Sequence, residues 1–367
     1  MYSELFVPLV GSTNERPFIK RLELSLAGRY ERYSDFGSTS NPKVGVRWSP
    51  NDVVSLNSTY GTSFRAPSLV DNLGSLTNLS LTNVFIQNIA DPTAPGGVRR
   101  GILVNGANPD LKPEEAKTWS LGAEIKPARG MNLSASYYKI DYSNRIDVVP
   151  SASALGQESL YSAYIQRNPS VAVVNSYFAS PNLQSPLENP SNILVIIDGR
   201  RNNLGTLKQQ GIDLDGRYSF NSSIGNWMLG VNVAKILKLT RSGAPGLPYV
   251  DVLDKFGNPV SLRVRATAGW KSGNWTANVF ANYTGGYTNT AVVPNVEVSS
   301  LTTTDASVSY AFDKDASFGL GGMVLSASAQ NLFDRAPPVV INGTSSWDSQ
   351  NASAIGRFIS VSLMKKW

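Results

Sequence analysis

Apolar and polar side chains alternate through many stretches of this chain, and this alternation constrains the fold more than any other feature. In the segment KTWSLGAEIKP, Trp119, Leu121, Ala123 and Ile125 share one face, while the residues between them are polar or glycine. The segment NWTANVFANYT repeats the pattern. A period of two residues is typical of a β-strand with one apolar face. We therefore predict an all-β fold.

The pattern predicts about thirteen strands, most of them about 8–14 residues long. They are expected near residues 3–10, 20–33, 42–49, 53–63, 116–126, 131–143, 204–219, 226–238, 262–271, 274–284, 301–312, 323–333 and 356–367. A tilted strand that crosses a membrane needs about 9–11 residues, whereas strands of soluble proteins average about five or six. No apolar run approaches the roughly 18 residues of a membrane helix. If the chain spans a membrane, it must therefore do so as part of a closed barrel, which leaves no backbone group unpaired in lipid.

The connections between the predicted strands alternate in length. Short turns are expected at 49–52, 126–130, 220–226 and 271–274, and long links at 64–115, 144–203, 239–261, 285–300 and 334–355. Pro67, Pro109 and Pro113 favour irregular structure in the first long link, and no segment shows a long helical period. Short periplasmic turns and long outer loops are typical of an antiparallel up-and-down transmembrane β-barrel. We predict that architecture.

Aromatic side chains gather at the ends of the predicted strands. Five tryptophans lie beside short turns or at the chain end: Trp48, Trp227, Trp270, Trp275 and Trp367. Tyrosines such as Tyr60 and Tyr137 lie at the opposite strand ends. A membrane barrel carries such girdles at its two lipid–water boundaries. A simple strand preference would instead scatter aromatic residues through the strand middles.

The composition excludes several classes of function. The chain contains no cysteine and no histidine, which removes thiolate metal sites, the usual imidazole ligand and histidine-dependent catalytic triads. Asp213 and Asp215 share a strand face, and we interpret them as lumen-facing residues rather than an acid–base pair. The net charge is +6, but the basic residues form no patch typical of nucleic-acid binding. We predict no catalytic residue, no metal or cofactor site and no nucleic-acid partner.

Several segments, taken in order, resemble the TonB-dependent receptor family. They are LAGRYERYSDFGSTSNPKVGVRWSP with LNSTYGTSFRAPSL, NPDLKPEEAKTWSLGAEIKP with LSASYYKIDYSNRI, NNLGTLKQQGIDLDGRYSF, SASAQNLFDRAPP and the terminal GRFISVSLMKKW. The resemblance implies a barrel of about twenty-two strands in the outer membrane of a Gram-negative bacterium. It also implies a plug domain, TonB-driven uptake of a scarce nutrient such as a ferric siderophore, and a last strand that the barrel-assembly machinery reads.

The number of predicted strands bears on domain organisation. About thirteen strands, without a plug or a TonB box, lead us to expect that residues 1–367 form the C-terminal portion of the barrel. The opening MYSELFVPLVG lacks the basic start and apolar run of a signal peptide, so we expect any signal peptide to lie upstream. A partial barrel has open strand edges, which lipid does not tolerate. The chain is therefore expected to be inactive alone.

The long links are where we expect a small-molecule ligand such as a metal chelate to bind, because loops carry binding residues. The candidate residues are Arg99, Arg100, Arg167, Arg200 and Arg201. A guanidinium group suits anionic ligands, although each arginine can equally be solvated surface charge. The alternative functions are a passive porin-like channel, a soluble β-rich adhesin and an outer-membrane hydrolase, which the lack of histidine disfavours. The sequence does not identify the ligand.

Overall fold

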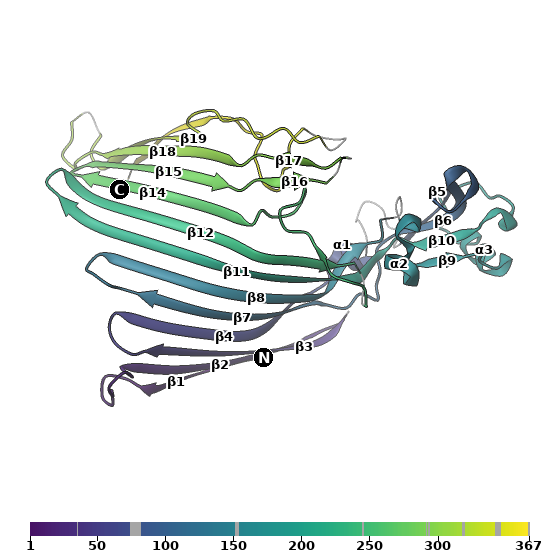
Figure 1. The fold of residues 1–367 in the computed structure, drawn as a ribbon, viewed down its shortest axis with the longest axis horizontal. Helices are drawn as coiled ribbons and strands as arrows, with labels where there is room; N and C mark the ends of the chain where they lie inside the picture. Colours follow the sequence, from purple (N-terminus) through teal and green to yellow (C-terminus); the bar gives the residue numbers. More distant parts are fainter. Residues whose placement is uncertain are drawn as a thin grey trace.

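The computed structural model contains one large antiparallel sheet, in which thirteen strands follow one another in chain order (Figure 1). These strands are β1 (Tyr2–Val10), β2 (Arg21–Tyr33), β3 (Gly37–Ser49), β4 (Val54–Arg65), β7 (Glu114–Ile125), β8 (Met131–Val148), β11 (Arg201–Ser222), β12 (Gly225–Ser242), β14 (Leu262–Ser272), β15 (Trp275–Thr284), β18 (Leu301–Ala311), β19 (Met323–Gln330) and β20 (Phe358–Lys365). The structure describes residues 1–34, 36–73, 82–150, 154–243, 246–290, 292, 294–317, 320–341 and 346–365.

The predicted strands and their alternating connections are confirmed. The long connections after β4, β8, β12, β15 and β19 all leave from one end of the sheet. One turn is tighter than predicted: β11 continues to Ser222 and β12 begins at Gly225, so only two residues lie between them. Gly225 has a φ of 130°, and a Cβ there would lie 2.5 Å from the carbonyl oxygen of Lys271. Glycine is therefore required at this turn.

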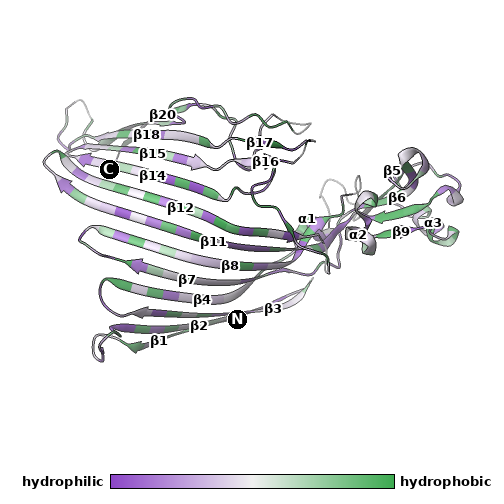
Figure 2. Cartoon of the chain, viewed as in Figure 1, coloured by the Kyte–Doolittle hydropathy of each residue, from purple (hydrophilic) through white to green (hydrophobic). Residues whose placement is uncertain are grey.

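The two faces of the sheet differ in polarity, as the alternating colours along each strand show (Figure 2). One face carries large apolar side chains that are open to the surroundings; Leu121 and Val279 are both 48% exposed. The opposite face carries Ser, Asn, Asp and Arg side chains, such as Asn232 and Arg265. A broad exposed apolar face across many strands indicates contact with lipid. We call the two faces the lipid face and the lumen face.

The long links after β4 and β8 fold into a separate unit, which we call the outer subdomain (Figure 1). Its four-stranded sheet has the order β5 (Thr82–Ala90), β6 (Val98–Gly106), β10 (Val195–Asp198) and β9 (Ile165–Arg167). The helix α3 (Val171–Phe178) packs on one face of this sheet, where Ile102, Val174 and Ile196 are buried together. A second buried cluster, with Leu103, Val195 and Ile197, lies on the other face.

The expectation of irregular structure is confirmed at Pro67, Pro109 and Pro113, which lie outside helices and strands, but it was wrong for the link as a whole, which contains β5 and β6. The central pairing of the outer subdomain joins β10 to β6 in parallel, with Val195 opposite Gly101. A pairing between segments so far apart leaves no local signal, and both strands are buried on two faces, which removes the alternation.

Shorter elements complete the fold. They are α1 (Leu69–Leu73), α2 (Glu158–Tyr161), β13 (Val250–Asp251), β16 (Tyr287–Asn289) and β17 (Val296–Val298).

Among the described residues, no helix is both long and apolar enough to cross a membrane. Within the same residues, β1 pairs only with β2 and β20 only with β19, so the large sheet has two open edges. The sheet is therefore an open, partial barrel.

Candidate functional site

Charged and polar side chains cover the lumen face near the middle of strands β11 and β14. A cavity of about 490 Å³ is lined by Asp213 and Asp215 on β11, and by Arg263 and Arg265 on β14. The amide of Asn232 donates a hydrogen bond to Asp215, and the Arg265 guanidinium lies 4.3 Å from the ring centroid of Phe280. The interpretation of these two aspartates as lumen-facing side chains fits their positions. A wall with both charge signs offers contacts to a polar solute or to a polar protein surface.

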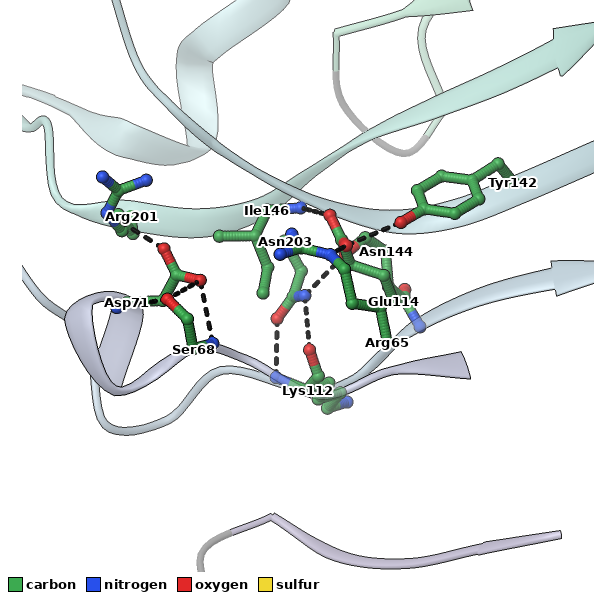
Figure 3. Close-up of polar contacts among 10 residues, drawn as sticks. All are labelled: Arg65, Ser68, Asp71, Lys112, Glu114, Tyr142, Asn144, Ile146, Arg201 and Asn203. Carbon is green, nitrogen blue, oxygen red and sulfur yellow. Dashed lines mark hydrogen bonds and ion pairs between the residues drawn. The ribbon is translucent and has the colours of Figure 1, made fainter. Parts of the chain in front are cut away.

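A network of polar contacts joins the outer subdomain to the sheet, as Figure 3 shows. Its centre is Glu114, the first residue of β7, whose side chain is 2% exposed. Glu114 accepts hydrogen bonds from the Tyr142 hydroxyl at 2.6 Å and from the Ile146 backbone N–H at 2.7 Å, and forms an ion pair with Arg65. A buried carboxylate is costly unless such partners surround it. The network therefore fixes the strand ends from which both long links leave.

Two further contacts extend this network toward α1 and β11 (Figure 3). Asn203 on β11 accepts a hydrogen bond from the Lys112 backbone N–H at 2.8 Å and donates one to the Lys112 carbonyl oxygen at 2.8 Å. Asp71 in α1 forms an ion pair of 3.1 Å with Arg201. Burial would raise the pKa of Asp71, but hydrogen bonds from Ser68 and the nearby Arg201 charge lower the pKa below its usual value.

The interior of the outer subdomain holds a second ion-pair network around Asp91, whose side chain is 0% exposed. Arg167 on β9 donates to Asp91 at 2.7 Å, and Arg99 on β6 donates to it at 2.5 Å. Arg167 also pairs with Glu158 of α2 at 2.8 Å. The hydrogen bond from Arg167, with those from Thr93 and Arg99, holds the pKa of Asp91 well below its usual range.

Each of the five candidate arginines forms an intramolecular ion pair. Arg99 and Arg167 share Asp91, and Arg201 pairs with Asp71. Arg100 pairs with Glu188 at 2.9 Å, and Arg200 pairs with Asp198 at 2.7 Å. A guanidinium has five N–H donors, so an ion pair does not prevent contact with a ligand. Ligand binding by these five residues remains a prediction.

A cavity at the outer mouth contains residues that the sequence analysis did not select. It has a volume of about 410 Å³ and lies where β8, β11 and β12 meet the outer subdomain; Arg145, Arg241 and Tyr161 are among its lining residues. Arg145 pairs with Asp147 at 3.1 Å, while Arg241 forms no ion pair with any described residue. The sequence analysis missed Arg145 and Arg241 because it ended these two strands at 143 and 238, whereas β8 continues to Val148 and β12 to Ser242.

The predicted boundary tryptophans lie at the short-turn end of the sheet. Trp227 and Trp270 are opposite each other in neighbouring strands, with ring centroids 6.5 Å apart. Trp275 packs against Tyr310 at 4.8 Å, and the Trp48 indole N–H donates to the Phe18 carbonyl oxygen at 2.9 Å. Trp367 lies outside the described residues. A row of aromatic rings at one end of the strands is typical of a lipid–water boundary. The location of these tryptophans at such a boundary remains a prediction.

The fold and the two faces define the class of protein as a membrane β-barrel wall. Over residues 13–332, the sequence matches the family model described as TonB dependent receptor-like, beta-barrel. The chain belongs to this family. No curated protein sequence matches the chain.

Solved structures share this fold at low sequence identity. The ferric enterobactin receptor from Pseudomonas aeruginosa, as its G324V mutant, is similar with a TM-score of 0.61 and 14% identity, over 99% of this chain and 44% of that chain. The siderophore receptor PirA from Acinetobacter baumannii has a TM-score of 0.60 and 15% identity, over 93% of this chain and 43% of that chain. The FrpB iron transporter from Neisseria meningitidis has a TM-score of 0.52 and 15% identity, over 93% of this chain and 42% of that chain. This chain thus spans less than half the length of these proteins.

Proposed function

We propose that the chain forms part of the wall of an outer-membrane receptor that takes up a metal chelate, such as a ferric siderophore, in a Gram-negative bacterium. The observation that carries this proposal is the combination of a lipid face, a polar lumen face and a folded outer subdomain at the mouth. The family match supports the receptor class. The similar structures named as a ferric enterobactin receptor and a siderophore receptor favour the ligand class.

The mouth cavity is the proposed place of first contact with the ligand. Arg145 and Arg241 supply positive charge, and Tyr161 supplies an aromatic ring. Arginine and aromatic groups together suit an anionic chelate that carries flat ring systems. Four of the five candidate arginines lie in the outer subdomain and Arg201 lies at the start of β11; in this proposal they provide further contacts for the ligand before it reaches the cavity.

The proposed receptor contains more strands than the large sheet has here, together with a plug domain inside the barrel. Each open edge of the sheet presents unpaired N–H and C=O groups, which cost several kcal/mol each in lipid. Because the sheet has an odd number of consecutive antiparallel strands, β1 and β20 run in the same direction. An additional odd number of strands would close the barrel with antiparallel pairs only. In this proposal residues 1–367 form the C-terminal portion of the barrel, as the resemblance of the segment GRFISVSLMKKW to the family's terminal strand implies.

An uptake experiment tests the proposed function. The whole receptor, produced in its own host, is expected to accumulate a radiolabelled ferric siderophore, and depletion of TonB is expected to abolish that accumulation. Cells that produce only residues 1–367 are expected to show no such uptake. TonB-dependent uptake by the 367-residue chain alone would contradict the partial-barrel proposal. Ion conductance that persists without TonB, together with no uptake by the whole receptor, would instead support a passive channel.

A further inference from the structure

A cavity of about 250 Å³ lies on the lumen face at the short-turn end of the sheet. Its walls come from the turn between β1 and β2, the turn between β3 and β4, and the end of β7; Glu15, Asp52 and Lys126 are among its lining residues. We call this space the short-turn cavity. Three neighbouring connections contribute to it, so only the folded sheet forms it.

The turn between β1 and β2, which carries Glu15, is longer than a hairpin requires. Ten residues lie between these two strands, whereas hairpin loops usually need about two to five. The turn is held by its own hydrogen bonds: the Asn14 amide donates to the Leu9 carbonyl oxygen at 3.1 Å and accepts from the Gly11 backbone N–H at 2.8 Å. The additional residues therefore form an ordered wall of the short-turn cavity.

Most charged side chains around the short-turn cavity have a partner of opposite sign, but Glu15 and Lys126 do not. Both residues are exposed and line the cavity, and neither forms an ion pair with another residue that the structure describes. One negative and one positive group are thus available to a ligand. The ion pairs around them are Lys20 with Asp52 at 2.5 Å, Arg47 with Glu124 at 3.0 Å and Arg21 with Glu23 at 3.5 Å.

A small ligand that carries an ammonium group and a carboxylate together matches these two charges. The carboxylate of Glu15 can accept hydrogen bonds from an ammonium group, and the Lys126 ammonium group can donate them to a carboxylate. A ligand of one charge sign would leave either Glu15 or Lys126 without a complementary group. The cavity is smaller than the roughly 300–1,000 Å³ of sites for drug-sized ligands, so it suits a group the size of an amino acid.

We infer that the short-turn cavity binds an α-amino acid group, with Glu15 at the ammonium and Lys126 at the carboxylate. This inference rests on the proposed outer-membrane location, which places the short turns in the periplasm, and it goes beyond the proposed uptake of a chelate. Free amino acids and the stem peptides of the cell wall both provide such a group there. Binding of a stem peptide would attach the receptor to the cell wall at the end opposite its outer subdomain.

A calorimetric titration of the whole receptor in non-ionic detergent tests this inference. The ligands are alanine, N-acetylalanine, alanine amide and a soluble cell-wall fragment whose stem peptide ends in diaminopimelate. Alanine is expected to bind at least about tenfold more tightly than either blocked form, because each blocked form loses one charged hydrogen-bonding group. The variant E15Q is expected to lose the preference over N-acetylalanine, and K126Q is expected to lose the preference over alanine amide.

A matched control removes one charge of each sign from other short turns. Lys271 and Asp315 are exposed at the same end of the sheet and do not line the short-turn cavity. The variant K271Q/D315N is therefore expected to bind alanine like the unmodified receptor, whereas E15Q/K126Q is expected to bind it at least about tenfold more weakly. Thermal unfolding of each variant checks that the receptor remains folded.

The outcomes separate this site from its alternatives. Tighter binding of the cell-wall fragment than of alanine would support the inference with the cell wall as the source, and equal binding would support it with free amino acids as the source. No binding of any ligand by the unmodified receptor would show that another part of the receptor fills the cavity, and would overturn the inference. Equal alanine binding by E15Q/K126Q and the unmodified receptor would also overturn it.

The proposed function is tested separately by ferric siderophore uptake. Normal uptake by a receptor that binds no amino acid would leave the proposed function intact and overturn only the inference. Amino acid binding that requires Glu15 and Lys126, in a receptor that takes up no siderophore, would support the inference and contradict the proposed function.

Discussion

The guanidinium group of Arg167 donates a hydrogen bond of 2.7 Å to the carboxylate of Asp91, which lies 76 positions earlier in the chain and has no exposed surface. This contact joins β9 to the turn between β5 and β6, and therefore ties the two long links into one outer subdomain. The unit that faces the outside thus depends on a buried charge pair as well as on its two apolar clusters.

Arg167→Gln is expected to destabilise the outer subdomain by about 1–3 kcal/mol, because Asp91 would lose a charged partner while buried. Arg200→Gln is the matched control, since Arg200 and Asp198 are both about one-third exposed and such a pair contributes about 1 kcal/mol or less. Amide hydrogen exchange in β5, β6, β9 and β10 measures the difference. Similar exchange rates in the two variants would show that the pair with Asp91 is not a main support of the subdomain.

Acid is expected to loosen the outer subdomain before the membrane sheet. The pKa of Asp91 is lowered from 3.8, chiefly by the hydrogen bond from Arg167. A carboxyl group with a lowered folded pKa stabilises the fold fully above its unfolded pKa, and this stabilisation is lost as the pH falls through the folded value. Protease cleavage in the outer links should therefore increase below about pH 4. Asp91→Asn should remove much of this pH dependence, and an unchanged acid response in that variant would contradict the explanation.

The face assignment gives a third prediction. Val279→Arg places a charge on the lipid face, and is expected to cost about 2–4 kcal/mol near the membrane midplane. Asn278→Arg, one position away on the lumen face, is expected to be much milder because its guanidinium can reach water. Urea unfolding of the receptor in lipid vesicles measures both. Equal losses of stability in the two variants would mean that the lipid and lumen faces are wrongly assigned.

The last strand gives a fourth prediction. The family resemblance implies that the barrel-assembly machinery reads the aromatic end of this strand, so deletion of Trp367 from the whole receptor is expected to lower its surface level. Surface labelling in the host measures this level. Phe18→Ala serves as an aromatic control, because the exposed Phe18 lies in the turn after β1 and accepts the hydrogen bond from Trp48 only through its backbone carbonyl oxygen. Normal surface levels without Trp367 would count against recognition of this end.

The sequence alone determined the strands, their faces and the side of the sheet from which the long links leave. Leu121 and Val279 could be placed on the lipid face because the two-residue period is a local property of an extended chain with one apolar side. The same local rule located the tryptophans beside the short turns. The family resemblance also depends on these strands, because most of the matching motifs lie in them.

Only the tertiary structure decided what the long links do. The pairing of β6 with β10, and of Arg167 with Asp91, depends on contacts between segments far apart in the sequence, which no local period encodes. For the same reason the sequence could not show that all five candidate arginines have carboxylate partners. Nor could it show that Arg65, Glu114 and Tyr142, from three strands, meet at the strand ends, because strand register is set by turn geometry and cross-strand pairing.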